Sequence, residues 1–278
     1  MIELNNVGLE KKGTPILQNV SLRVRSGRFT VIAGRNGAGK SSLLNILSGE
    51  EKAFSGEVTL NGRAIQTYSL SSLAQMRAVL PQSNQPGFAF TVEQVVELGA
   101  FPFVVSGGKK RALISDILEK LDIARMRKRE ITTLSGGERQ KVHFARVWLQ
   151  AKLSPNPCPI VFLDEPANNL DITCQHEIFS LLQQECAQNR LSVVAIVHDI
   201  NLAARYADDI IFLKSGRLLR CSAADQCLKE DILEEALGHP VTVLHHPCSS
   251  CPLIIPQSNR TNSNLFHHEH HIANTTSR

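Results

Sequence analysis

The sequence predicts an α/β fold built on a parallel β-sheet. Three apolar segments in the later half of the chain have the length and composition of buried strands: Ile160 to Leu163, Ser192 to Val197 and Ile210 to Leu213. Helical stretches, roughly Thr173 to Gln188 and Asn201 to Ala207, lie between them. Continuous apolar strands that alternate with helices are typical of a parallel sheet covered on both faces.

The N-terminal part of the chain predicts further strands, including an antiparallel pair. Apolar and polar residues alternate over Ile2 to Leu4 and over Val20 to Val24, and Thr30 to Ala33 is a short β-branched run. Glu57 to Leu60 leads into Asn61-Gly62, which is typical of the tight turn in an antiparallel hairpin.

The middle of the chain, about Thr91 to Ala151, contains no convincing strand and predicts several helices. Its segment Lys109 to Glu130 carries eight basic and four acidic residues. A solvated helical face is the simpler interpretation of this charge, and an interaction surface is the alternative.

Composition excludes several classes of protein. Hydrophobic residues make up 42% of the 278 residues, as in globular proteins, and the longest apolar stretches, such as Val193 to Val197, are far shorter than a membrane-spanning helix. The segment Met1 to Leu4 does not begin a secretory signal. A net charge of +4 gives no argument for a nucleic-acid partner, and seven scattered Cys favour reduced thiols in the cytosol.

Residues 34–41 read Gly-Arg-Asn-Gly-Ala-Gly-Lys-Ser and match the phosphate-loop pattern at all four specified positions. The segment follows a predicted strand and opens a helix, so its backbone N–H groups can point at phosphate oxygens. Lys40 can reach the outer phosphates, and the Ser41 hydroxyl can ligate Mg²⁺. The predicted nucleotide-binding residues are Gly34, Arg35, Asn36, Gly37, Ala38, Gly39, Lys40, Ser41 and Ser42.

Two carboxylates, Asp164 and Glu165, follow a buried strand directly. In a parallel sheet this end of the strand lies beside the phosphate loop, where ligands gather. We expect Asp164 to hold Mg²⁺, directly or through water, and Glu165 to act as general base on the attacking water. His198 follows the next buried strand and can hydrogen-bond the terminal phosphate.

Phosphate loops occur in many families, and the segment Leu134-Ser135-Gly136-Gly137-Glu138 distinguishes among them. Ser135 and the Gly-Gly backbone present hydrogen-bond donors at the start of a predicted amphipathic helix. Together with the loop, the carboxylates and His198, in this order, the segment resembles the ABC ATPase family. The resemblance covers residues 1 to about 240.

The resemblance implies a P-loop NTPase ABC cassette with a RecA-like parallel-sheet core. An N-terminal antiparallel β subdomain and a helical subdomain at about residues 91–151 complete the ATPase domain, which we place at residues 1–244. Residues 245–278 are expected to form a polar tail without stable structure.

Further site residues follow from the resemblance alone. Gln82 matches a glutamine that contacts Mg²⁺ and senses the transmembrane partner. Ser135, Gly136 and Gly137 would bind the terminal phosphate of the nucleotide that the opposite subunit holds. ATP and Mg²⁺ would therefore lie between two ATPase subunits in a head-to-tail homodimer. Ala167 and Asn168 differ from the commonest residues of the family at the segment that crosses this dimer.

One departure from the family concerns the adenine. The family often places an aromatic residue near the start of the chain to stack on the base, and the aligned position is Lys11 here. The aliphatic stem of Lys11 and backbone contacts are then expected to hold the adenine.

The cargo class is inferred from the modules that the chain lacks and from the similarity of short segments to particular importers. A second cassette, a long coiled coil or a basic extension would favour a soluble ABC protein that acts on DNA or ribosomes, and none is seen. The segments 77–82, 90–99, 142–146 and 198–208 are similar to bacterial importers of iron compounds and vitamin B12, most of all to haem importers. Import of ferric siderophores or vitamin B12 is the alternative.

This resemblance implies a peripheral protein at the cytoplasmic face of the bacterial inner membrane. Its partners would be two transmembrane permease subunits and, indirectly, a periplasmic substrate-binding protein. Phe88 and Phe90 are candidates for contact with the permease, and buried packing is the alternative for both.

The tail contains Cys248 and Cys251 in a CxxC pattern, preceded by His245 and His246. Two thiolates and two imidazoles could hold zinc. Because the chain has no second CxxC and prolines flank the first, a tail that binds no metal is favoured.

Overall fold

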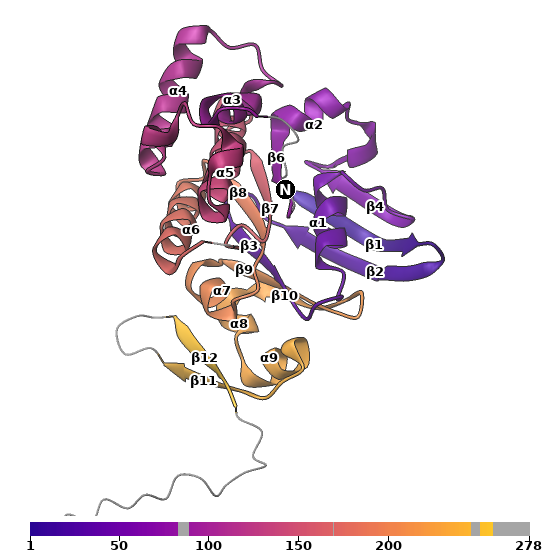
Figure 1. The fold of residues 1–278 in the computed structure, drawn as a ribbon. Coiled ribbons are helices and arrows are strands. Elements are labelled where there is room, and N and C mark those ends of the chain that lie inside the picture. Colours follow the sequence, from indigo (N-terminus) through magenta and orange to yellow (C-terminus); the bar gives the residue numbers. More distant parts are fainter. Residues whose placement is uncertain (83–88, 169, 246–250, 258–278) are drawn as a thin grey trace, which may run out of the picture.

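The computed structural model describes residues 1–82, 89–168, 170–245 and 251–257. Its centre is a six-stranded sheet with the strand order β10-β9-β3-β8-β7-β6 (Figure 1). Strand β10 at one edge pairs antiparallel with β9, and the other five strands run parallel. The strands are β3 (Phe29–Ala33), β6 (Arg77–Leu80), β7 (Ile160–Asp164), β8 (Ser192–Ile196), β9 (Asp209–Lys214) and β10 (Arg217–Ala223).

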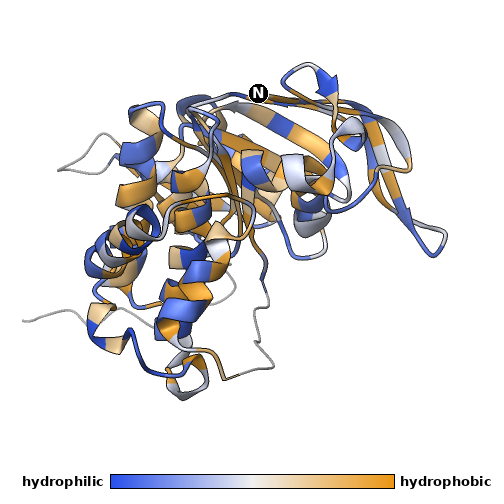
Figure 2. Cartoon of the chain, turned by 90° about the horizontal axis from the view of Figure 1, so that it is seen from above, coloured by the Kyte–Doolittle hydropathy of each residue, from blue (hydrophilic) through white to orange (hydrophobic). Residues whose placement is uncertain are grey.

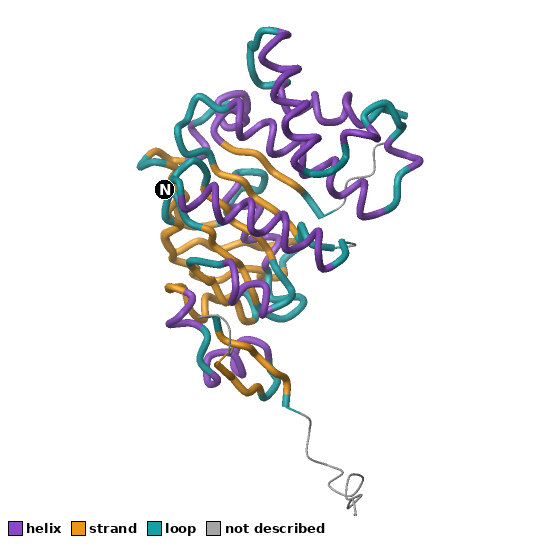
Figure 3. Tube along the Cα trace, turned by 90° about the vertical axis from the view of Figure 1, so that its left-hand side faces the viewer, coloured by secondary structure: helices purple, strands orange, loops and turns teal. Residues whose placement is uncertain are grey.

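Both faces of this sheet are covered, which confirms the prediction from the apolar strands (Figures 1 and 3). Alternate residues of one strand enter different cores, so Val31 and Val193 pack in one layer while Ile32 and Val194 pack in the other. The first layer is completed by helices α5 (Gly136–Leu153), α6 (Ile172–Ala187) and α7 (Ile200–Tyr206). The second layer is completed by α1 (Lys40–Ser48) and a separate β-sheet.

That separate sheet is the predicted antiparallel unit near the N-terminus, with the strand order β2-β1-β4-β5. The turn between β4 and β5 contains Asn61 and Gly62, both with positive φ, so the hairpin predicted from Asn-Gly is confirmed. The strands are β1 (Ile2–Lys11), β2 (Thr14–Val24), β4 (Ser55–Leu60) and β5 (Arg63–Ala64).

The middle of the chain is helical, as predicted, and it forms a lobe at one end of the molecule (Figure 1). Its helices are α3 (Val92–Glu97), α4 (Gly107–Lys120) and the first turns of α5, joined by short 3₁₀ turns at Leu98–Ala100, Ala124–Met126 and Ile131–Thr133. Thr91 begins α3 with a capping box, because its hydroxyl accepts from the Gln94 N–H and the Gln94 side chain accepts from the Thr91 N–H. Helix α2 (Leu70–Met76) precedes β6, after a 3₁₀ turn at Ile65–Thr67.

One segment near the end of the described residues differs from the prediction. Residues 252–256 were expected in an unstructured tail, but Pro252–Pro256 forms strand β12, which pairs antiparallel with β11 (Val241–His245). The hairpin holds because Asn201 of α7 accepts from the Ile254 N–H at 2.8 Å and donates to the Ile254 carbonyl at 3.1 Å, with Ile254 buried. Helices α8 (Ala224–Cys227) and α9 (Glu230–Leu237) lead into this hairpin.

Hydrophobic residues are frequent on the strands of the two sheets (Figure 2), and the buried ones form the two cores between these sheets and the helices. Within residues 1–82, 89–168, 170–245 and 251–257, no helix has both the length and the apolar character needed to cross a membrane.

Candidate active site

The phosphate loop lies between the end of β3 and the start of α1, as the motif predicts. Gly34 has a φ of 139°, and a Cβ atom there would lie 2.3 Å from the carbonyl oxygen of Leu213, so only glycine fits. Gly39 caps α1 with a φ of 98°, in close contact with Leu17 of β2. The loop is thus fixed between the central sheet and the antiparallel unit, with its N–H groups at the start of a helix.

Lys40 is the first residue of α1, and its side chain folds back into the loop. Its Nζ donates hydrogen bonds to the carbonyl oxygens of Gly34 at 2.9 Å and Arg35 at 3.0 Å. Burial lowers the pKa of this amine, and the carboxylates of Glu165 and Asp164 partly oppose the effect. Lys40 has no ion pair among the described residues, so its buried amine is positioned where phosphate oxygens would compensate its charge.

Arg35 contributes to the loop through its backbone, whereas its side chain packs on the end of α9. A Cβ atom at Gly238, which ends α9 with a φ of 67°, would lie 2.9 Å from Nη1 of Arg35. The guanidinium group therefore packs against this glycine. Arg35 and Ala38 line a neighbouring cavity of about 380 Å³ and not the one that contains Lys40.

Asp164 is the last residue of β7 and is only 6% exposed. Burial raises the pKa of its carboxyl group, while a hydrogen bond with Ser41 opposes the rise. Its Oδ1 atom is buried and has no hydrogen-bond partner among the described residues. Ser41 and Asp164, predicted as metal ligands, are thus neighbours, and an oxygen of the pair is available to a cation.

Glu165 follows β7 with a φ of 55° and is held by three side chains. Gln82 donates from Nε2 to Oε2 at 2.9 Å, Asn168 donates to the same oxygen, and His198 Nε2 lies at Oε1. Burial acts to raise the pKa of Glu165, but the hydrogen bonds from His198, Gln82 and Asn168 outweigh it, and the pKa lies below its usual value. The carboxylate is ionised at neutral pH, as a general base requires.

One cavity of about 600 Å³ brings these predicted groups together. The phosphate loop forms one wall and the three polar residues from β6, β7 and β8 form another. Its lining residues are Ile16, Asn36, Gly37, Gly39, Lys40, Ser41, Ser42, Gln82, Glu165 and His198. Glu165 and His198 therefore line the same cavity as the phosphate loop.

Ser135 begins α5 with a second capping box. Its Oγ accepts from the Glu138 N–H at 3.2 Å, and the Glu138 carboxylate accepts from the Ser135 N–H at 2.8 Å. Ser135, Gly136 and Gly137 line a cavity of about 690 Å³ that shares no residue with the cavity of the phosphate loop. Within one protomer the two motifs are therefore apart.

Two positions at the candidate site were not predicted from the residues. Asn168 was noted only as a departure from the family, yet it holds the predicted base, and its position three residues after Glu165 in a turn was the available signal. Ile16 supplies an apolar part of the cavity wall, and nothing in its local sequence indicated this. Of the proposed zinc ligands, His246 and Cys248 lie outside the described residues. Among all residues that the structure describes, no group of three or more His, Cys, Asp or Glu side chains could hold a metal ion.

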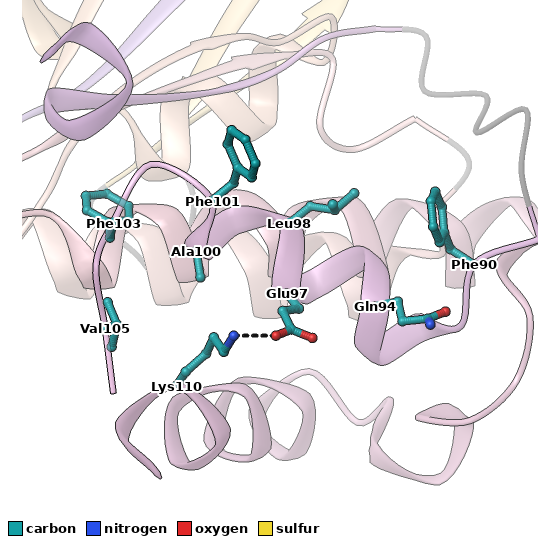
Figure 4. Close-up of a pocket in the computed structure, with 9 residues that line it drawn as sticks. All are labelled: Phe90, Gln94, Glu97, Leu98, Ala100, Phe101, Phe103, Val105 and Lys110. Atoms are coloured by element: carbon teal, nitrogen blue, oxygen red, sulfur yellow. Dashed lines mark ion pairs between the residues drawn. The ribbon is translucent and has the colours of Figure 1, made fainter. Parts of the chain in front are cut away.

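The helical lobe carries a groove of about 430 Å³ that is lined by residues of α3, of the 3₁₀ turn after it and of the start of α4 (Figure 4). Leu98 is 50% exposed and Phe101 is 90% exposed, and both side chains point to the same side of the α3 segment as Phe90. An ion pair between Glu97 and Lys110 crosses from α3 to α4. Phe90 is thus at the groove, whereas Phe88 lies outside the described residues.

Known proteins are similar to this chain over nearly its whole length. A family described as ABC transporter matches residues 17–168. The hemin import ATP-binding protein HmuV of Shewanella denitrificans is 37% identical over 255 residues, which are 92% of this chain and 100% of that protein. HmuV of Photobacterium damselae subsp. damselae is also 37% identical, over 91% of this chain and 95% of that protein.

Solved structures share the fold. The ATP-binding cassette MJ0796, in a dimeric post-hydrolysis state with ADP and Pi, is 29% identical with a TM-score of 0.71 and covers 81% of this chain and 99% of its own. A chain of an ABC transporter in an inward-facing conformation has a TM-score of 0.75 at 23% identity, over 92% of this chain and 97% of its own. Because the matched family spans more than half of the sequence and the relatives span nearly all of it, the chain belongs to the ABC transporter family of ATPases.

Proposed function

We propose that this chain is the ATPase subunit of an importer that moves haem through a membrane permease. The hydrolytic part of the proposal rests on the cavity that brings Lys40, Glu165 and His198 together. The cargo rests on relatives that carry the name hemin import ATP-binding protein, because one of them is matched along its entire length.

Hydrolysis would proceed within the cavity of the phosphate loop. The loop N–H groups and the Nζ of Lys40 hold the phosphates of ATP, so that negative charge lies at the start of α1. The Glu165 carboxylate accepts a proton from the water that attacks the terminal phosphorus. His198 and Gln82, which both contact Glu165, orient this carboxylate and the water.

The oxygen donors beside the loop fit Mg²⁺. The free Oδ1 of Asp164 and the hydroxyl of Ser41 are hard ligands of the kind that this ion prefers, and the carbonyl oxygen of Gln82 is a third. When bound there, Mg²⁺ would neutralise charge that develops on the phosphates.

Two copies of the chain would act together. Ser135 and Gly137 present donors at the start of α5, but their cavity is separate from that of the phosphate loop. A head-to-tail homodimer would place these donors on the terminal phosphate of ATP held by the partner. The dimeric state of the 29% identical cassette MJ0796 supports this arrangement.

The permease would dock on the groove of the helical lobe. The exposed faces of Leu98 and Phe101 are apolar, and such a patch on a monomer marks an interaction site. A helix of a permease subunit in this groove would hold the ATPase at the cytoplasmic face of the membrane, with a periplasmic binding protein contributing only through the permease.

Phe101→Asp tests the docking surface. We expect this variant to lose co-purification with the permease from native membranes by about tenfold or more, since burying a carboxylate in an apolar interface is costly. ATP affinity and thermal stability should stay unchanged, because Phe101 is 90% exposed. Val104→Asp is the matched control, since Val104 is fully exposed yet does not line the groove. Equal loss in both variants would contradict docking at the groove.

The cargo is tested with the reconstituted importer. The ATPase and its permease are co-purified from the native membrane and placed in proteoliposomes together with the binding protein. We expect haem, offered with the binding protein, to stimulate ATP hydrolysis and to accumulate inside the vesicles, with no accumulation in a Glu165→Gln importer. Stimulation by a ferric siderophore or vitamin B12 and not by haem would contradict the proposed cargo.

A further inference from the structure

The loop between α3 and α4 presents apolar side chains to solvent. Residues 101–105 read Phe-Pro-Phe-Val-Val, and the exposed fractions of Phe101 and Val104 are 90% and 109%. The loop runs from Phe101 past Phe103 toward the helix that carries Lys110 (Figure 4). Val104 does not line the groove of the helical lobe, so the exposed apolar surface extends beyond the groove. Large apolar side chains that are exposed in one short loop indicate a contact surface.

Two contacts give this loop a defined position. The side chain of Gln75 in α2 donates to the Pro102 carbonyl oxygen at 2.9 Å. At Gly99 an added Cβ would lie 2.2 Å from the Arg146 carbonyl oxygen of α5, so the turn that precedes the loop packs tightly on that helix. The loop is therefore anchored on both α2 and α5 while its apolar side chains stay exposed.

Basic residues follow the apolar loop directly. Lys109, Lys110 and Arg111 lie at the start of α4, and residues 98–115 contain no acidic residue. Lys110 forms an ion pair with Glu97, whereas Lys109 and Arg111 have no ion pair among the described residues. Cations at the start of a helix oppose its dipole, so these three residues do not serve the stability of α4. Positive charge beside exposed apolar side chains indicates a partner that is both anionic and apolar.

The surface of a membrane with anionic phospholipids has both properties. Its phosphates attract Lys and Arg, and the boundary between its headgroups and acyl chains accepts apolar side chains. A nucleic acid would neutralise Lys109 and Arg111 but would offer no apolar phase to Val104. An apolar protein segment would cover Val104 but would leave the two cations without a counter-charge. The combination of charge and apolar surface therefore favours the membrane.

We propose that the loop at residues 101–105, together with Lys109 and Arg111, binds the surface of a membrane that contains anionic phospholipids. Phe101 and Val104 enter the boundary between headgroups and acyl chains, and the two cations contact lipid phosphates. Because Phe101 also lines the groove, the loop and the groove face the membrane from the same side of the lobe. This contact requires neither the permease nor a nucleotide, and it goes beyond the function proposed above.

Flotation with lipid vesicles tests this contact on the purified full chain, without permease and without nucleotide. The vesicles contain phosphatidylcholine alone or phosphatidylcholine with about 30% phosphatidylglycerol. We expect the wild type to bind the anionic vesicles about tenfold or more tightly than the neutral ones, and added salt to weaken this binding. The double variant Lys109→Ala, Arg111→Ala should bind the anionic vesicles about 10- to 30-fold more weakly, since each cation near such a surface contributes about fivefold. Val104→Asp should weaken binding by about tenfold, because a carboxylate is costly to bury.

A matched control separates this loop from the total charge of the chain. The double variant Lys12→Ala, Lys229→Ala removes the same charge from two exposed lysines outside the helical lobe, and it should bind vesicles as the wild type does. The exchange Lys109→Arg, Arg111→Lys should also retain binding, because it preserves both charges. All these variants should keep the melting temperature and the ATP affinity of the wild type, since the altered residues are exposed and do not line the cavity of the phosphate loop.

Three results would overturn the proposal. Wild type that binds anionic vesicles no better than neutral ones would remove the role of lipid charge. Equal weakening in the Lys109, Arg111 variant and in its control would assign the binding to total charge. Val104→Asp that binds vesicles as tightly as the wild type would leave only a contact for polyanions, nucleic acids included. The proposed import function would stand in all three cases, because it is tested by co-purification with the permease in detergent, where Val104→Asp is expected to behave as the wild type.

Discussion

Glu165→Gln should retain ATP binding and lose hydrolysis by about 10²- to 10⁴-fold, the range expected when a general base is removed. The glutamine has the shape of the glutamate, so its one oxygen can still accept from Gln82 and Asn168 while its amide nitrogen faces His198. It cannot take a proton from water, however, because the amide is not a base. The rate of phosphate release checks the loss of hydrolysis, and the dissociation constant of ATP, measured on the same preparation, checks the retained binding.

The same variant should also report on the dimer. If ATP lies between the Ser135 segment of one protomer and the phosphate loop of the other, unhydrolysed ATP keeps the two together. Glu165→Gln should therefore elute as a dimer in ATP and as a monomer without nucleotide, whereas Ser135→Arg in the same background should remain monomeric in ATP. Hydrolysis at the wild-type rate would refute Glu165 as the base, and a monomer in saturating ATP would refute the shared site.

Four strands of the central sheet, β3, β7, β8 and β9, were predictable because they are apolar on both faces, whereas the edge strand β10 carries Arg217, Arg220 and Ser222 and was not predicted. The segments at Ile160 and Ser192 have no helical periodicity, and the structure places both at the middle of the parallel sheet. Strand β6 was not predicted as a strand, because it has only four residues and begins with Arg77. It is nevertheless the edge strand that precedes Gln82 and brings this residue to the cavity. Gln82 was therefore predicted as a site residue from the resemblance to the family and not from its local sequence.

The hairpin at the end of the chain shows what local sequence cannot reveal. Strand β12 reads Pro-Leu-Ile-Ile-Pro, and prolines at both ends argue against a strand in the interior of a sheet. The structure uses it in a two-stranded hairpin, where Asn201 satisfies the backbone of Ile254 from a helix 53 residues earlier in the chain. A contact between residues so far apart in the sequence cannot be predicted from a local pattern.

The candidate site was predictable where a short motif fixes the geometry. The phosphate loop and the carboxylates after β7 lie at the same edge of the sheet because parallel strands end there together. The contact between Asn168 and Glu165 depends on the turn that follows β7, and the contact of Lys11 with Ser42 depends on how the antiparallel unit packs on α1. Both require the tertiary structure, and neither is specified by residue type.

Lys40→Ala should weaken ATP binding by about 10- to 100-fold, the range of a charge-assisted hydrogen bond to phosphate that is lost in a buried site. The free energy of unfolding should change little, because burial already disfavours the charged amine, as its lowered pKa indicates, and only carbonyl oxygens of Gly34 and Arg35 accept from it. Lys40→Met separates the two effects, since it keeps the aliphatic stem and removes the charge. Calorimetric titration with ATP and thermal unfolding should show equal loss of affinity in both variants and a native melting temperature in Lys40→Met. Retained affinity in Lys40→Met would mean that the buried ammonium group does not meet the phosphates, and the placement of the phosphates at the start of α1 would then be wrong.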